Sequence, residues 1–178
     1  MSEERFLETW RGRGALVVSR FEFQKTGLSS AVVLPPDLVR EAARDLLAEG
    51  FFLETITAAE VREGLLVTYL YASPAEPGRR LAVRALAAKG GSLPSVAPVC
   101  PGAEWHEREA ADFLGLEFQG NPNPVPLLLP HDFPGPPPLL KTAGEKAASL
   151  GDLKIFGQAE FLDPAWQALA GPGGEAAP

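Results

Sequence analysis

Short apolar runs bounded by turn residues dominate the first half of the chain. Residues 30–34 read Ser-Ala-Val-Val-Leu and are followed by Pro35 and Pro36, a pattern typical of a short strand. Three further runs are either rich in β-branched and aromatic residues or alternate apolar with polar residues. These runs predict strands over residues 51–57, 65–71 and 79–86.

One helical pattern separates the first two predicted strands. Asp37 is placed to cap the N-terminus of a helix, and Gly50 is placed to end it in a left-handed conformation. Between them apolar residues recur at the spacing of one helix face. The recurring residues are Leu38, Ala42, Leu46 and Leu47.

The pattern of the fourth predicted strand, residues 79–86, indicates how the sheet is covered. Three apolar residues alternate there with three residues that we expect to face water, which favours an antiparallel sheet with one covered face. Strand, helix and then several strands indicate an α+β fold: a mixed, mainly antiparallel sheet with helices on one face. The inward residues are Leu81, Val83 and Ala85, and the outward ones are Arg80, Ala82 and Arg84.

Proline divides the chain unequally. Of the 18 prolines, four precede residue 90 and fourteen follow it. Because proline fixes φ and lacks an N–H donor, a proline-dense stretch suits neither helix interiors nor central strands. We therefore predict an α+β core over residues 1–118 and a proline-rich extended C-terminal arm over residues 119–170 that makes its contacts on other surfaces. Residues 171–178 are small and are expected to be disordered.

Charge and cysteine content narrow the function. The net charge of −7 disfavours a nucleic-acid partner, because phosphate binding needs surplus Lys and Arg. The single cysteine, Cys100, can form no internal disulfide and cannot hold an iron–sulfur cluster. With no signal peptide and no long apolar run, the expectation is a cytoplasmic protein that reaches a membrane only through another chain.

Residues 102–122 hold the most informative pattern. Pro101 and Gly102 predict the start of a helix and Gly115 its end. Glu104 and Arg108 are spaced for an i,i+4 ion pair. A helical stripe carries two carboxylates between two aromatic residues, which predicts burial, and buried carboxylates need cationic or N–H partners from this chain or another. The stripe consists of Trp105, Glu109, Asp112 and Phe113.

The same segment resembles the W-x-E-R-E-x-x-D-x-x-G-I-x-F signature of the 30 kDa subunit family of NADH:quinone oxidoreductase, whose members also serve in membrane-bound hydrogenases. Weaker similarity extends over roughly residues 30–141. Two departures stand out: Asn121 replaces the histidine of a G-H-P segment, and a basic segment near the end keeps Lys141 but lacks its arginine and aspartate. The matching residues are Trp105, Glu107, Arg108, Glu109, Asp112, Gly115 and Phe118, with Leu116 for the usual isoleucine.

The resemblance implies a non-catalytic subunit of a larger redox complex. NADH, FMN, iron–sulfur clusters and quinone would belong to partner subunits. The chain would pack against the large, 49 kDa-like subunit and neighbouring iron–sulfur subunits, on the cytoplasmic face of the inner membrane. On this view Arg108→Ala weakens assembly. The expected interface residues are Trp105, Glu107, Arg108, Glu109, Asp112, Phe113, Gly115, Phe118, Pro122 and Lys141.

Two alternatives remain at the level of sequence. The first is the equivalent subunit of a membrane-bound nickel–iron hydrogenase. The second is a free-standing acid–base enzyme that uses Glu107, Glu109 and His106, which requires these side chains to share a closed pocket. One histidine among carboxylates is a weak pattern for a metal site, and we expect none.

Overall fold

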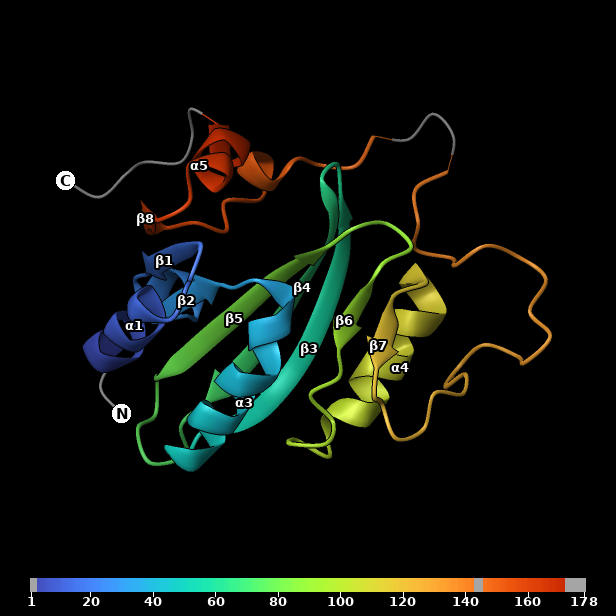
Figure 1. Cartoon of the computed structure of the whole chain (residues 1–178), viewed down its shortest axis with the longest axis horizontal. Coiled ribbons are helices and arrows are strands. Elements are labelled where there is room, and N and C mark those ends of the chain that lie inside the picture. The colour runs from blue at the N-terminus through green and yellow to red at the C-terminus, as the bar shows by residue number, and fades with distance from the viewer. Residues whose placement is uncertain (1–2, 143–145, 172–178) are drawn as a thin grey trace.

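The fold is an α+β sandwich built on one large sheet, as the computed structural model shows for residues 3–142 and 146–171 (Figure 1). The six strands follow the order β3-β4-β5-β2-β1-β8, and all neighbours are antiparallel except β2 and β5. The predicted α+β class and mainly antiparallel sheet are confirmed. The strands are β1 Val17–Arg20, β2 Ser30–Val33, β3 Phe52–Val61, β4 Gly64–Ala72, β5 Arg80–Ala87 and β8 Gln158–Phe161.

Across the described residues, a small second sheet and five α-helices complete the fold. The second sheet pairs β6 (Ser92–Pro94) in parallel with β7 (Glu117–Gln119). The helices are α1 Glu3–Gly12, α2 Phe23–Thr26, α3 Val39–Ala48, α4 Ala103–Leu114 and α5 Pro164–Ala170, with short 3-10 turns η1 Pro36–Leu38 and η2 Leu150–Leu153.

Helix α3 ends as its sequence predicts but begins later. Gly50 has a φ of +81°, and the N–H groups of Gly50 and Phe51 donate to the carbonyls of Leu47 and Leu46, the hydrogen bonds of a Schellman motif. The predicted N-cap at Asp37 is wrong. Asp37 lies inside the 3-10 turn η1 that Pro36 initiates, and the helix starts at Val39 without a side-chain cap.

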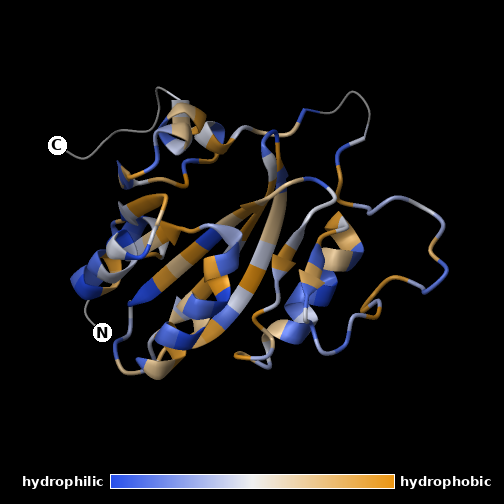
Figure 2. Ribbon diagram, in the orientation of Figure 1, coloured by the Kyte–Doolittle hydropathy of each residue, from blue (hydrophilic) through white to orange (hydrophobic). Residues whose placement is uncertain are grey.

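Three helices cover one face of the sheet and form the main core. Side chains of α1, α3 and α4 form one apolar cluster there with residues of the large sheet. Tyr69 and Tyr71 of β4 and Trp10 of α1 are among its largest fully buried side chains. Figure 2 shows orange, hydrophobic positions recurring along the strands of the large sheet and along α3. This core supplies the rigid support on which α4 lies.

The C-terminal segment covers the other face of the sheet. The prediction that Ala82 and Arg84 face water is therefore wrong: Ala82 is fully buried and Arg84 is 5% exposed. Arg84 donates from Nη1 to the Ile155 carbonyl over 2.7 Å, and burial lowers the pKa of its guanidinium to about 10. A second apolar cluster unites this face with Trp166 of α5.

The segment after α4 is extended only in part. Residues 120–142 contain no helix or strand, in keeping with their prolines. From Leu150 the chain returns to the sheet, where β8 pairs with β1 along its edge (Figure 1). The division of the chain at residue 118 stays a prediction, and of the expected disordered tail all but Gly171 lies outside the described residues.

Candidate functional site: helix α4 and the segment it holds

Helix α4 turns a different stripe inward from the one that the aromatic residues suggest. Its buried residues are Ala103, Glu107, Ala110 and Leu114, at helical spacing. Trp105 is 66% exposed, so the burial predicted for its stripe is not supplied to Trp105 by this chain. The helix ends where predicted, because Gly115 is left-handed with a φ of +65°.

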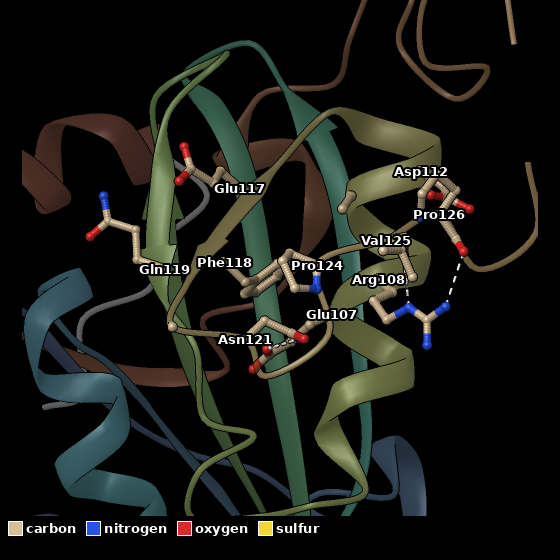
Figure 3. A pocket seen from close by; sticks show the side chains of 12 residues that line it. Glu107, Arg108, Asp112, Glu117, Phe118, Gln119, Asn121, Pro124, Val125 and Pro126 are labelled. Atoms are coloured by element: carbon tan, nitrogen blue, oxygen red, sulfur yellow. Dashed lines mark hydrogen bonds between the residues drawn. The ribbon is translucent and has the colours of Figure 1, made fainter. Parts of the chain in front are cut away.

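Glu107 is the fully buried carboxylate of the site. It accepts hydrogen bonds from Ser95 Oγ over 2.6 Å and from the Val96 N–H over 2.7 Å. A third comes from Asn121 Nδ2 over 2.8 Å (Figure 3). Burial raises the pKa of Glu107, and these donors act in the opposite direction. The partners that a buried carboxylate requires thus come from within the chain, as neutral O–H and N–H groups.

Arg40 reinforces the same junction without forming an ion pair with Glu107. Arg40 of α3 donates from Nε to the Ser95 carbonyl over 2.7 Å and from Nη2 to the Gln119 carbonyl over 3.1 Å. These bonds join α3 to both strands of the small sheet. Glu107 and Arg40 together therefore fix β6 and β7 between α3 and α4.

Arg108 and Glu104 hold the segment that follows β7 against α4. Arg108 donates from Nε to the Val125 carbonyl over 2.8 Å and from Nη2 to the Pro126 carbonyl over 3.0 Å (Figure 3). Its Nη1 pairs with Glu104 Oε1 over 2.9 Å, which confirms the predicted i,i+4 pair. Asn123 Nδ2 donates to the same oxygen over 3.0 Å. The charges of α4 are thus used to order an irregular segment.

Asp112 holds the next residues of that segment. Its Oδ2 accepts hydrogen bonds from three successive backbone N–H groups, those of Leu127, Leu128 and Leu129, over 2.8–3.0 Å. Burial acts to raise the pKa of Asp112, but the three N–H donors together outweigh it and lower that pKa below its usual value of 3.8. The ionised carboxylate is therefore the form that orders residues 127–129.

The lowered pKa of Asp112 predicts how acid affects this segment. A depressed folded-state pKa contributes stability above the unfolded value of 3.8, and that stability is lost as the pH falls through the folded value. We expect Asp112→Asn to speed amide hydrogen exchange of Leu128 and Leu129 severalfold at neutral pH, because one acceptor oxygen and its charge are lost. Equal exchange rates in the two proteins would contradict the assignment.

Large apolar side chains remain exposed on and beside α4. Among the described residues six large hydrophobic side chains are exposed, and five of them lie between residues 105 and 139. We call these five the outer apolar surface. They are Trp105, Val125, Leu128, Phe133 and Leu139.

The structure does not bring the residues of the acid–base hypothesis into one pocket. Glu107 adjoins a cavity of about 420 Å³ between α4, β7 and residues 120–126. His106 and Glu109 line a separate cavity of about 150 Å³ against β3. Across residues 3–142 and 146–171, no three His, Cys, Asp or Glu side chains converge to hold a metal ion.

The remaining residues expected at the interface differ in position. Phe118 is buried in the main core, and Phe113 is half-buried beside Leu139 in the smaller cavity. Pro122 and Lys141 are exposed. Sequence reasoning missed Ser95, Val96 and Arg40, whose partners are distant along the chain. The small or apolar residues at 103, 110 and 114 carried a signal for the inward face of α4.

No helix within the described part of the chain has both the length and the apolar character needed to cross a membrane.

Comparisons with known proteins give a consistent family. The family model described as "Respiratory-chain NADH dehydrogenase, 30 Kd subunit" matches residues 32–147, well over half of the chain. A subunit of the NADH-quinone oxidoreductase of Chlorobium phaeobacteroides is 47% identical over 66 residues, which cover 36% of this chain and 40% of that relative. A subunit of the NAD(P)H-quinone oxidoreductase of Synechococcus sp. (strain WH7803) is 34% identical over 88 residues, 48% of this chain and 43% of that relative.

A solved structure agrees with these sequences. It is described as Nqo5, a trypsin-resistant fragment of residues 1-134, and it superposes with a TM-score of 0.56 at 29% identity, covering 69% of this chain and 99% of that chain. Each match to the two curated relatives spans less than half of the relative's length. On its fold, on the signature carried by α4 and on these similarities, the chain belongs to the family of the 30 kDa subunit of respiratory-chain NADH dehydrogenase.

Proposed function

We propose that the chain is a structural subunit of a complex I-type NADH:quinone oxidoreductase and that it docks against the large subunit of the peripheral arm. NADH, FMN, iron–sulfur clusters and quinone would be bound by partner subunits, and this chain would bind none of them. The assembly would place it on the cytoplasmic side of the membrane, which it would reach only through its partners.

The outer apolar surface is the observation that carries this proposal. Five of the six large hydrophobic side chains exposed in the described residues lie on α4 or on residues 125–139. Large apolar side chains exposed to solvent are typical of protein–protein interfaces, in which aromatic side chains serve as anchors. Trp105, which is 66% exposed, is the largest of them.

Charged residues of the family signature on α4 hold part of the outer apolar surface in place. Arg108 and Asp112 bind backbone groups of residues 125–129 and so hold Val125 and Leu128 in place. A preformed surface loses less conformational entropy on association than a flexible one. We infer that the family signature on α4 orders a docking segment and that Trp105 and the residues of this segment make the contacts.

Trp105→Ala tests the docking surface, with Phe52→Ala as the matched control. Phe52 is 48% exposed but lies on β3, outside the surface. Each variant would be expressed with an affinity tag in the native host in place of the natural chain. We expect Trp105→Ala to reduce the co-purified large subunit severalfold, in line with about 1–2 kcal/mol for an aromatic anchor.

The control is expected to retain the large subunit, and both variants should melt at the temperature of the natural chain. If the amount of large subunit that co-purifies with Trp105→Ala is undiminished, the proposed docking surface is refuted. Mass spectrometry of the co-purified subunits tests the complex itself. NADH-binding and flavin subunits would support the proposal, and nickel–iron hydrogenase subunits would replace it with the hydrogenase alternative.

A further inference from the structure

A basic cavity of about 570 Å³ lies apart from the site on α4. It forms where the turn between β3 and β4 meets the end of β5, Lys141 and residues 146–147. Four exposed cationic residues line it, together with a single carboxylate. In a chain of net charge −7 this is a local reversal of sign. The cations are Arg62, Lys89, Lys141 and Lys146, and the carboxylate is Glu60.

Glu60 compensates one of these four charges. Its Oε1 forms an ion pair with Lys89 Nζ, and its Oε2 accepts the backbone N–H of Lys141 over 2.5 Å. The hydrogen bond from Lys89 and then that from Lys141 lower the pKa of Glu60, so it stays ionised. Glu60 therefore joins β3 to the segment at Lys141 and matches the charge of Lys89.

Three cations around the cavity have no ion-pair partner among the described residues. Within residues 3–142 and 146–171, the side chains of Arg62, Lys141 and Lys146 form no ion pair within 4.0 Å of a carboxylate. At longer range the charge of Arg62 acts on Asp152 and that of Lys141 on Glu60. Like charges around one cavity repel each other, and an anion placed among them relieves that repulsion. The cavity is thus complementary in charge to an acidic ligand.

We propose that Arg62, Lys141 and Lys146 bind an acidic peptide segment of the subunit on which this chain docks. The inference rests on the proposed function, since it assigns the cavity to the same partner. Leu139 of the outer apolar surface precedes Lys141 by two residues, and its N–H donates to the Phe113 carbonyl at the end of α4 over 2.9 Å. The basic cavity therefore continues the docking surface along the chain.

The geometry favours carboxylates along a peptide over a single phosphate. Compact phosphate sites gather backbone N–H groups at a helix N-terminus or in a tight loop. Here the N–H of Lys141 is occupied by Glu60, and that of Arg62 donates to the Ala148 carbonyl over 2.9 Å. Cationic groups on long side chains around a wide cavity suit several charges that are spread along an extended chain.

The test measures binding of a fluorescently labelled deca-glutamate peptide to the full chain at low ionic strength. The variant combines Arg62→Gln, Lys141→Gln and Lys146→Gln. Its matched control combines Lys25→Gln, Arg44→Gln and Lys154→Gln, three exposed cations outside the cavity. We expect the cavity variant to bind roughly tenfold more weakly and the control to change less than about twofold. Binding by the natural chain should weaken with added salt.

Three outcomes would overturn the proposal: no binding of the peptide by the natural chain, equal losses in the two triple variants, or competition by inorganic phosphate at the peptide's own concentration. The proposal would also be overturned if the natural chain bound vesicles of anionic phospholipid through the cavity but did not bind the peptide. Failure here is distinct from failure of the docking proposal. Trp105→Ala reports on docking in the native host, whereas peptide binding reports on the cavity alone.

Discussion

Replacement of Glu107 with alanine is expected to lower the free energy of unfolding by about 3–5 kcal/mol. Glu107 is fully buried, and its removal would take the acceptor from Ser95 Oγ, the Val96 N–H and Asn121 Nδ2. The truncation also leaves a void between α4 and β6. Urea unfolding followed by circular dichroism measures the change, and a loss below about 1 kcal/mol would contradict the assigned role.

Glu107→Gln separates the charge of this residue from its shape. Glutamine keeps one acceptor oxygen, so the expected loss is smaller, about 1–2 kcal/mol at neutral pH. A raised folded-state pKa means that the protonated form is favoured by folding, and this contribution is lost as the pH rises from the unfolded value of 4.5 through the folded value. The free energy of unfolding of the natural chain should therefore exceed that of Glu107→Gln by more at about pH 5 than at about pH 8. A difference in unfolding free energy that grows as the pH rises would contradict the raised pKa of Glu107.

Local sequence signals were sufficient for most of the main sheet and for α4. The apolar run at residues 30–34 and the alternation at 79–86 correspond to β2 and β5, and Gly115 ends α4 as its left-handed conformation requires. These features depend on neighbours a few residues away. The stripe of aromatic residues predicted burial by this chain or another and did not identify the face that α4 turns to its own core, which carries Ala103, Glu107, Ala110 and Leu114. In a chain with an exposed docking surface the aromatic residue can lie outside.

Long-range contacts were beyond the reach of local pattern. Arg84 reads as a surface residue until the C-terminal segment covers it, and the many prolines gave no indication that residues 158–161 pair with β1. The acceptor role of Glu107 depends on Ser95 and Asn121, which are 12 and 14 residues away. The family resemblance named the residues of the site. It did not indicate that their first partners lie within the same chain.

Arg108→Ala is expected to reduce assembly with the large subunit more than tenfold while costing only about 2 kcal/mol in unfolding free energy. The carboxylate of its partner Glu104 is 25% exposed and keeps its bond from Asn123, so no buried charge is left alone. The larger loss is that of the two hydrogen bonds from Arg108 to the carbonyls of Val125 and Pro126. Water can replace those bonds, which keeps the cost in stability modest.

The effect on assembly is larger because both carbonyls belong to residues 125–129, which we propose dock on the large subunit. Without Arg108, residues 125–126 are no longer held against α4, although Asp112 still binds residues 127–129. Ordering Val125 again on association then weakens binding. Arg108→Lys keeps the charge but cannot span Glu104 and two carbonyls with one ammonium, so it should resemble alanine more than arginine. Arg44→Ala, at an exposed arginine of α3, serves as the control and should leave assembly unchanged. Full assembly with Arg108→Lys would show that charge alone suffices and that the fork of hydrogen bonds does not order the segment.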